Sequence, residues 1–278
     1  MEKIFPLKEP TGEGVSKEIT CLKGEVASFQ IGYFWNYDRK MYGKVKVITD
    51  TDISVKVRTV GLVPCAYPYY LQADNDYLTT EPGLYPDLLS DVTQYGFPLV
   101  VNQWRSLWVD VETTACTKAG KYPIKIELLV QDTEEKEEFE LEIEVLDAEL
   151  PVLSIPHTEW FHCDCLANYY NVEVFSEEHW RIIENFIQTA VKRKCNMILT
   201  PIFTPPLDTA VGGERRTVQL IDITVTESGY EFGYEKFERW VQMCQRCGMQ
   251  YFEISHLFSQ WGAIATPKIV GMVNGEEK

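Results

Sequence analysis

Hydrogen-bonding side chains and one large ring follow three segments that we predict to be buried strands in the second half of the chain. The segments are 159–163, 196–200 and 250–255. The candidate binding residues at or just beyond their ends are His162, Asp164, Asp208, Arg215, His256 and Trp261. Carboxylate, imidazole and guanidinium groups beside an indole ring suit a ligand with hydroxyl groups and a C–H face that stacks on the ring. We therefore predict a small-molecule binding region at these strand ends.

Each candidate also has a purely structural alternative. His162 is equally compatible with a core imidazole, because only alternate residues of a barrel strand face inward. Asp208 could form a turn, and Arg215 could pair with Glu214 on the surface. Trp261 could instead be buried at a domain interface. The sequence leaves these alternatives open.

The elements that would position these residues alternate between strand and helix. Ser176 is the predicted N-cap of a helix that ends near Lys192, and a second helix ends at the predicted C-cap Gly248. Between them, 218–232 has the pattern of a β-hairpin. A strand–helix–strand–helix–strand series predicts a parallel sheet covered by helices. Residues 151–278 are thus predicted to be α/β, as the first three β/α units of a TIM-type (β/α)8 barrel, truncated after the third.

The first half has a period of two instead. In 139–145, apolar and acidic residues alternate strictly, as in a strand with one face on a core. Several such strands without helical patterns predict an antiparallel β-sandwich domain over 1–150. A segment rich in Tyr, Asp and Pro, 64–98, interrupts the pattern. We interpret it either as a loop over the domain interface or as an aromatic platform that reaches the ligand.

The amino-acid composition limits the classes of binding partner. The 42 acidic residues outnumber the 26 basic ones, which gives a formal net charge of −16. Such a charge disfavours nucleic acid and anionic membrane as partners, but it is compatible with neutral sugars. No apolar run approaches the roughly 18 residues that span a bilayer. Because no secretory signal is visible, we predict a cytoplasmic protein, with a lost leader as the alternative.

The spacing of the cysteines is compatible with a metal site, but their predicted positions disfavour one. Two pairs, Cys163 with Cys165 and Cys244 with Cys247, have spacings that occur in zinc sites. The second pair lies on the apolar stripe of a predicted helix, away from the first, so the two pairs cannot share an ion. We predict buried free thiols and no metal. No Gly-x-Gly-x-x-Gly follows the first strand, so we expect no cofactor.

Several longer phrases resemble a known family. Those at 61–64, 82–87 and 103–109 resemble the N-terminal β-sandwich of glycoside hydrolase family 123-like proteins. Those at 199–209 and 253–258 resemble the first part of that family's catalytic barrel. The resemblance implies a glycoside hydrolase, β-N-acetylgalactosaminidase-like, with a glycan substrate. It also implies a retaining, substrate-assisted mechanism in which the substrate's 2-acetamido oxygen replaces an enzyme nucleophile.

The resemblance assigns no catalytic residue to this chain. Family members carry adjacent catalytic Asp and Glu on a later strand, and no Asp-Glu dipeptide occurs here. We therefore predict that this pair lies beyond residue 278 and that the chain alone is inactive. The alternatives are a non-catalytic carbohydrate-binding or structural module, and an inactive fragment. An open barrel edge would favour self-association.

Overall fold

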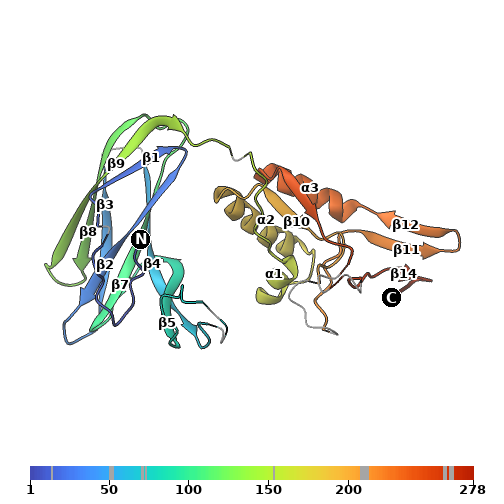
Figure 1. The fold of residues 1–278 in the computed structure, drawn as a ribbon, viewed down its shortest axis with the longest axis horizontal. Coiled ribbons are helices and arrows are strands. Elements are labelled where there is room, and N and C mark those ends of the chain that lie inside the picture. The colour runs from blue at the N-terminus through green and yellow to red at the C-terminus, as the bar shows by residue number, and fades with distance from the viewer. Residues whose placement is uncertain are drawn as a thin grey trace. The chain divides into compact units, whose positions relative to one another are not determined.

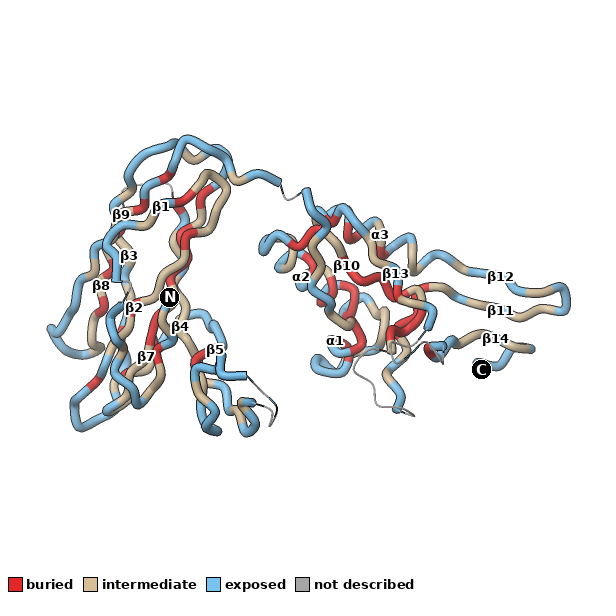
Figure 2. Tube along the Cα trace, in the orientation of Figure 1, coloured by how far each residue is buried: buried red, intermediate tan, exposed pale blue. Residues whose placement is uncertain are grey.

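The chain forms two compact units, Met1–Pro151 and Val152–Lys278, in a computed structural model (Figure 1). The structure describes residues 1–278 except 14, 50–52, 70, 71, 73, 153, 207–212, 259–261 and 263–265. Each unit has its own cluster of buried apolar side chains. Buried residues, red in Figure 2, occur in both units. The two units are therefore described one at a time.

The first unit consists of two sheets around one core. One sheet has the strand order β1-β9-β8-β3-β6, and the other has the order β2-β7-β4-β5. The strands are β1 (Glu18–Lys23), β2 (Val26–Trp35), β3 (Met41–Ile48), β4 (Ser54–Cys65), β5 (Gly83–Asp91), β6 (Phe97–Leu99), β7 (Gln103–Glu112), β8 (Gly120–Val130) and β9 (Lys136–Glu149). Alternate residues supply the core, as Leu107, Val109 and Val111 of β7 do, each with 0% of its surface exposed.

Two features of this unit differ from the sequence-based expectation. The sheets are not wholly antiparallel, because β1 pairs with β9 in parallel. The expected long loop at 64–98 contains β5, which pairs with β4, and the start of β6. β5 is an edge strand with mostly exposed side chains. It therefore lacks the half-buried alternation from which strands are recognised in a sequence.

The second unit packs two amphipathic helices on a short parallel sheet. Its elements are α1 (Cys163–Tyr169), α2 (Glu177–Lys192), β10 (Met197–Thr200), β11 (Asp222–Thr226), β12 (Gly229–Gly233), α3 (Glu235–Cys247), β13 (Tyr251–Ile254), β14 (Met272–Val273) and β15 (Glu276–Glu277). β10 and β13 pair in parallel, with Thr200 opposite Ile254. Ile183 of α2, Ile198 of β10 and Trp240 of α3 belong to one buried cluster.

The helix boundaries and the hairpin agree with the sequence. Ser176 Oγ accepts a hydrogen bond from the His179 N–H and caps α2, as predicted. Gly248 ends α3 in a left-handed conformation with φ of 103°, as a C-cap glycine does. β11 and β12 form the predicted hairpin. Local signals thus defined these elements.

The prediction of the first three units of a (β/α)8 barrel is wrong. The described residues contain three helices in all, and the parallel sheet of the second unit has two strands, too little for such a barrel. The segment expected as the first barrel strand instead leads into α1, with a single bridge from Thr158 to Met197. A run of five residues is too short for its period to distinguish a strand from a helical segment.

Two short strands lie at the C-terminal end of the second unit, after the third predicted strand. β14 pairs in parallel with β11 and in antiparallel fashion with β15. The turn between β14 and β15 is Asn274-Gly275, with φ of 53° and 84°. Asn-Gly favours such a turn because both residues tolerate positive φ. The result is a sheet of order β12-β11-β14-β15.

Candidate functional site

A buried ion pair lies at the centre of the candidate site in the second unit. Asp164, in the first turn of α1, receives two hydrogen bonds from Arg215, from Nε to Oδ2 at 2.9 Å and from Nη2 to Oδ1 at 3.0 Å. The two side chains are only 4% and 13% exposed. A bidentate pair with little solvent around it holds its geometry. It therefore fixes the segment around Arg215 against α1.

A buried histidine also holds the start of α1. His179 of α2 is fully buried, and its Nε2 donates to the carbonyl of Cys163 at 2.9 Å. Its Nδ1 accepts from the Phe175 N–H, so the ring is neutral with the proton on Nε2. Burial lowers the pKa of His179, and this favours the same neutral form. α1 is thus anchored to α2 by His179 and to the loop by Arg215.

Arg215 of this ion pair lines an open pocket of about 350 Å³. Its walls are formed by Thr204, Pro205, Pro206, Gly213, Glu214, Arg215, Thr217 and Lys268. Lys268 Nζ donates to Glu214 Oε2 at 3.2 Å, which joins two segments 54 residues apart. The volume lies at the lower end of the range for small-ligand sites, and the walls combine ring faces with charged groups and hydroxyls.

The ends of β10 and β13 lie beside each other, so the residues that follow them converge. The Ser255 N–H donates to the Thr200 carbonyl at 3.0 Å, and Ser255 Oγ donates to the Phe203 carbonyl at 3.2 Å. The next residue, His256, has a buried Nε2 for which the described residues supply no hydrogen-bond partner. A buried polar atom of this kind is costly unless something binds it. His256 thus offers a contact point for a ligand at this edge.

The structure brings some of the predicted residues together. Asp164 and Arg215 are in direct contact, and His162 lines a small cavity with Asp164 and Trp240. The alternative in which Arg215 pairs with Glu214 is not found; Glu214 pairs with Lys268. Asp208 and Trp261 lie outside the described residues. The binding role of all six residues stays a prediction.

Sequence reasoning missed two contributors. His179 was not singled out, although it shares the i, i+4, i+8 face of α2 with Ile183 and Ile187 and could have been noticed there. Lys268 was missed because no local pattern connects it with Glu214. Near the same strand ends, Glu253 of β13 accepts a 2.6 Å hydrogen bond from Trp160 Nε1.

The two cysteine pairs that raised the question of a metal site differ in burial and in the element that carries them. Cys163 is buried and Cys165 is exposed, because both lie on α1 and not on a strand. Burial raises the pKa of the Cys244 thiol to about 12, so it stays protonated at neutral pH. No group of three or more His, Cys, Asp or Glu side chains that could hold a metal ion occurs among the residues that the structure describes.

A family model matches this unit. Residues 160–277 match the model of the glycoside hydrolase 123 catalytic domain. No curated protein sequence matches the chain.

The fold of a family 123 glycoside hydrolase from Clostridium perfringens, solved in work on glycolipid glycan hydrolysis, is similar. The TM-score is 0.70 at 15% sequence identity, and the match covers 94% of this chain and 47% of that one. The chain therefore spans about half the length of this solved structure, and the likeness shows the fold alone.

Two further solved structures match only part of the chain. One is the CooA pilin subunit from enterotoxigenic Escherichia coli, at 13% identity and a TM-score of 0.27, over 54% of this chain and all of that one. The other is a PapD-like domain of human CEP192, at 9% identity and a TM-score of 0.26, over 49% and 84% of the two chains. Scores this low support no argument about fold.

Proposed function

We propose that this chain, whose residues 160–277 match the glycoside hydrolase 123 catalytic domain, takes part in glycan hydrolysis of the β-N-acetylgalactosaminidase type and supplies sugar-binding residues for it. The solved relative from Clostridium perfringens is described in connection with glycolipid glycan hydrolysis, and a glycan of that kind is the proposed substrate class here. One observation carries the proposal: the bidentate Asp164–Arg215 pair borders the pocket inside the matched domain.

In this proposal the pair is a positioning device. Arg215 donates to both carboxylate oxygens of Asp164, so these oxygens act as hydrogen-bond acceptors. The pair holds the pocket wall that carries Glu214 and Thr217 in one place. Hydroxyls of a sugar would bond to these side chains, and the faces of Pro205 and Pro206 would lie against its C–H groups. Preorganisation of this sort lowers the entropic cost of binding.

Glu214, which lines the pocket, and Asp164, which is bonded to the lining residue Arg215, are not arranged as a catalytic pair. Glycosidic cleavage needs a proton donor, with either a second carboxylate or the substrate's own acetamido oxygen as nucleophile. Asp164 is tied to Arg215, and Glu214 is tied to Lys268. We assign binding and orientation, and no proton transfer, to the described residues of this chain.

A substitution that keeps the positive charge of Arg215 but removes its planar guanidinium group tests the proposal. Arg215→Lys cannot make both hydrogen bonds to Asp164, so the pocket wall should loosen. Affinity for a methyl N-acetyl-β-galactosaminide, measured by NMR titration, should fall at least tenfold, while the circular dichroism spectrum stays unchanged.

The matched control is Arg181→Lys, on the exposed surface of α2 and paired there with Glu178. It should leave the affinity unchanged. Equal affinity for the wild type and a folded Arg215→Lys protein would contradict the proposed binding role.

A further inference from the structure

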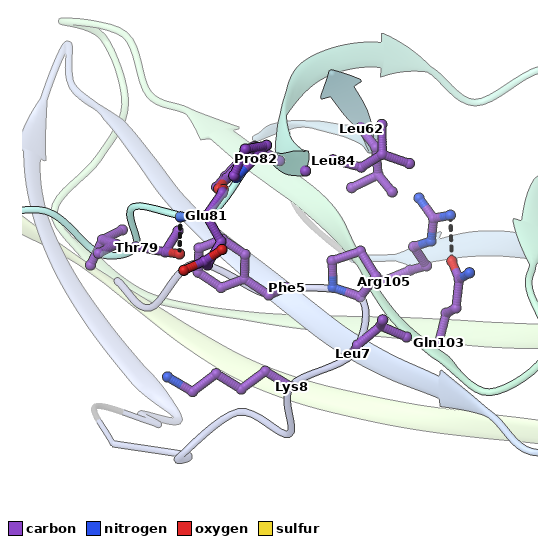
Figure 3. A pocket seen from close by; sticks show the side chains of 14 residues that line it. Phe5, Leu7, Lys8, Leu62, Thr79, Glu81, Pro82, Leu84, Gln103 and Arg105 are labelled. Carbon is purple, nitrogen blue, oxygen red and sulfur yellow. Dashed lines mark hydrogen bonds between the residues drawn. The ribbon is translucent and has the colours of Figure 1, made fainter. Parts of the chain in front are cut away.

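A separate pocket of about 580 Å³ lies on the sandwich unit (Figure 3). Its walls come from the N-terminal segment Phe5–Lys8, from Leu62 of β4, from the segment Leu78–Tyr85, and from Gln103 and Arg105 of β7. The Trp104 N–H donates to the Pro6 carbonyl at 2.9 Å and ties the N-terminal segment to β7. The rings of Phe5 and Tyr85 meet edge to face, with centroids 6.0 Å apart.

The pocket contains an arginine at a position where the strand pattern calls for an apolar residue. Arg105 is two residues before Leu107, and alternate residues of a strand share a face. Leu107 and Val109 on that face have no exposed surface. Arg105 therefore places a half-buried cation with a buried Nε at the end of this row of buried side chains, which is costly without a charged partner.

The part of the chain that the structure describes gives this cation only partial compensation. Nη2 donates to Gln103 Oε1 at 2.7 Å, as Figure 3 shows, and the buried Nε has no hydrogen-bond partner. No ion pair joins Arg105 to a described carboxylate, although Glu81 lines the same pocket. Burial lowers the pKa of the Arg105 guanidinium, consistent with a cation that has lost water without gaining an anion.

The charge around the pocket is opposite to that of the chain. Lys8 also lines the pocket, and Lys3 lies nearby, with its Nζ 3.2 Å from the Pro86 carbonyl. Of the described residues that line the pocket, two are cationic, Lys8 and Arg105, and one is a carboxylate, Glu81, in a protein with a net charge of −16. A positively charged pocket attracts an anionic ligand even where the net charge of the whole protein is negative.

We propose that this pocket binds a sugar residue that carries a carboxylate. The carboxylate accepts hydrogen bonds from Arg105, whose planar guanidinium matches it in geometry. Gln103 and Thr79 are placed to bond the sugar hydroxyls, and Phe5 and Pro82 offer apolar faces to its C–H groups. The site lies in the other unit from the pocket at Arg215 and would bind a different sugar.

Paired ligands isolate the role of the carboxylate. Methyl β-glucuronide and methyl β-glucoside differ only in a carboxylate in place of a hydroxymethyl group. The 278-residue chain is titrated with this pair, with N-acetylneuraminic acid and with acetate, by calorimetry at low and at high salt. We expect at least one acidic sugar to bind at least tenfold more tightly than methyl β-glucoside and than acetate, and more weakly at high salt. The proposal would be overturned if neither acidic sugar binds more tightly than methyl β-glucoside. Equal binding of acetate would show a carboxylate site without sugar selectivity and would also overturn it.

Substitutions then locate the site. Arg105→Gln should weaken binding of the acidic sugar at least tenfold, and Arg105→Lys should weaken it less. Lys44→Gln, which removes a charge from an exposed residue of β3, is the matched control and should have no effect.

Arg105 lies next to the buried core, so its substitution risks misfolding. A second variant at the pocket therefore tests the site independently. Lys8→Glu changes an exposed side chain at the pocket and should weaken binding severalfold while the fold stays intact. Unchanged binding in a folded Arg105→Gln or Lys8→Glu protein would refute the site. Arg215→Lys should leave this affinity unaltered, so failure here is distinct from failure of the proposed function.

Discussion

A single buried carboxylate, Asp110, connects three strands of the sandwich unit. It is 1% exposed, and it accepts hydrogen bonds from Ser28 at 2.7 Å, Arg58 at 2.5 Å and Trp108 at 2.8 Å. Burial by itself would raise the pKa of Asp110, but these donors outweigh it and lower the pKa. Asp110 is therefore ionised in the folded protein at neutral pH.

Asp110→Asn should destabilise the protein strongly, because it leaves the Arg58 guanidinium without its buried partner. The expected loss in free energy of unfolding is about 3–5 kcal/mol, measured by urea denaturation. The control Asp91→Asn removes an exposed partner of Arg58 and should cost less than about 1 kcal/mol.

The pH dependence of the same variant gives a second readout. The pKa of Asp110 is lower in the folded than in the unfolded state, so unfolding takes up a proton below about pH 4 and stability rises with pH there. The stabilisation is complete above the unfolded-state pKa and is lost as pH falls through the folded-state pKa. The wild type should lose stability in this range more steeply than Asp110→Asn; parallel curves would contradict this.

At the residue scale, the sequence predicted the types of several site residues but not their contacts. Asp164 and Arg215 were chosen as neighbours of predicted strand ends, and the structure joins them across 51 positions. The surface alternative, Arg215 with Glu214, was the local one, and long-range packing replaced it. The Glu214–Lys268 pair and the Cys163–His179 hydrogen bond have no local signature, so sequence periodicity could not identify them.

Local signals were most reliable at the ends of the helices of the second unit. The cap at Ser176, the acidic first turn of α2 and the glycine after α3 could all be predicted, because each depends on residues within one turn. Whether 159–163 forms a strand or a helix could not be predicted, because the conformation of a short apolar segment depends on the elements that pack against it. α1 is held by His179 and Arg215, neither of which is near it in the sequence.

Ser176→Ala should therefore destabilise α2 by a predictable amount. The substitution removes the acceptor of the His179 N–H and should lower the free energy of unfolding of the second unit by about 1 kcal/mol. Ser176→Asp, which can still cap, should restore most of the loss, as thermal denaturation would measure. Equal stability of the Ala and Asp variants would show that the cap contributes nothing.

At the scale of the whole molecule, the sequence indicated a change of architecture near residue 150 but misjudged the architecture after it. The period changes from two to 3.6 there, which is a local property. Whether a strand–helix series closes into a barrel depends on the number of strands that pair, and the described residues pair only β10 with β13 in the parallel sheet of the second unit. None of the described helices is long and apolar enough to span a membrane.

The chain spans about half the length of the family 123 structure that it resembles, and its described residues carry two pockets in two units. In this account the units differ in ligand. The pocket at Arg215 would take an N-acetyl-β-galactosaminide, and the pocket at Arg105 would take an acidic sugar. The difference follows from charge, because Arg215 is already neutralised by Asp164 whereas Arg105 has no carboxylate partner among those residues.

Hydrogen–deuterium exchange of the chain with and without a saturating N-acetyl-β-galactosaminide tests the central claim most directly. We expect slower exchange in 200–206, 213–219 and 266–270, which form or adjoin the pocket at Arg215, and no change in the sandwich unit. The same protection should be lost in Arg215→Lys. Binding without protection of these segments, or protection confined to residues 1–151, would contradict the account.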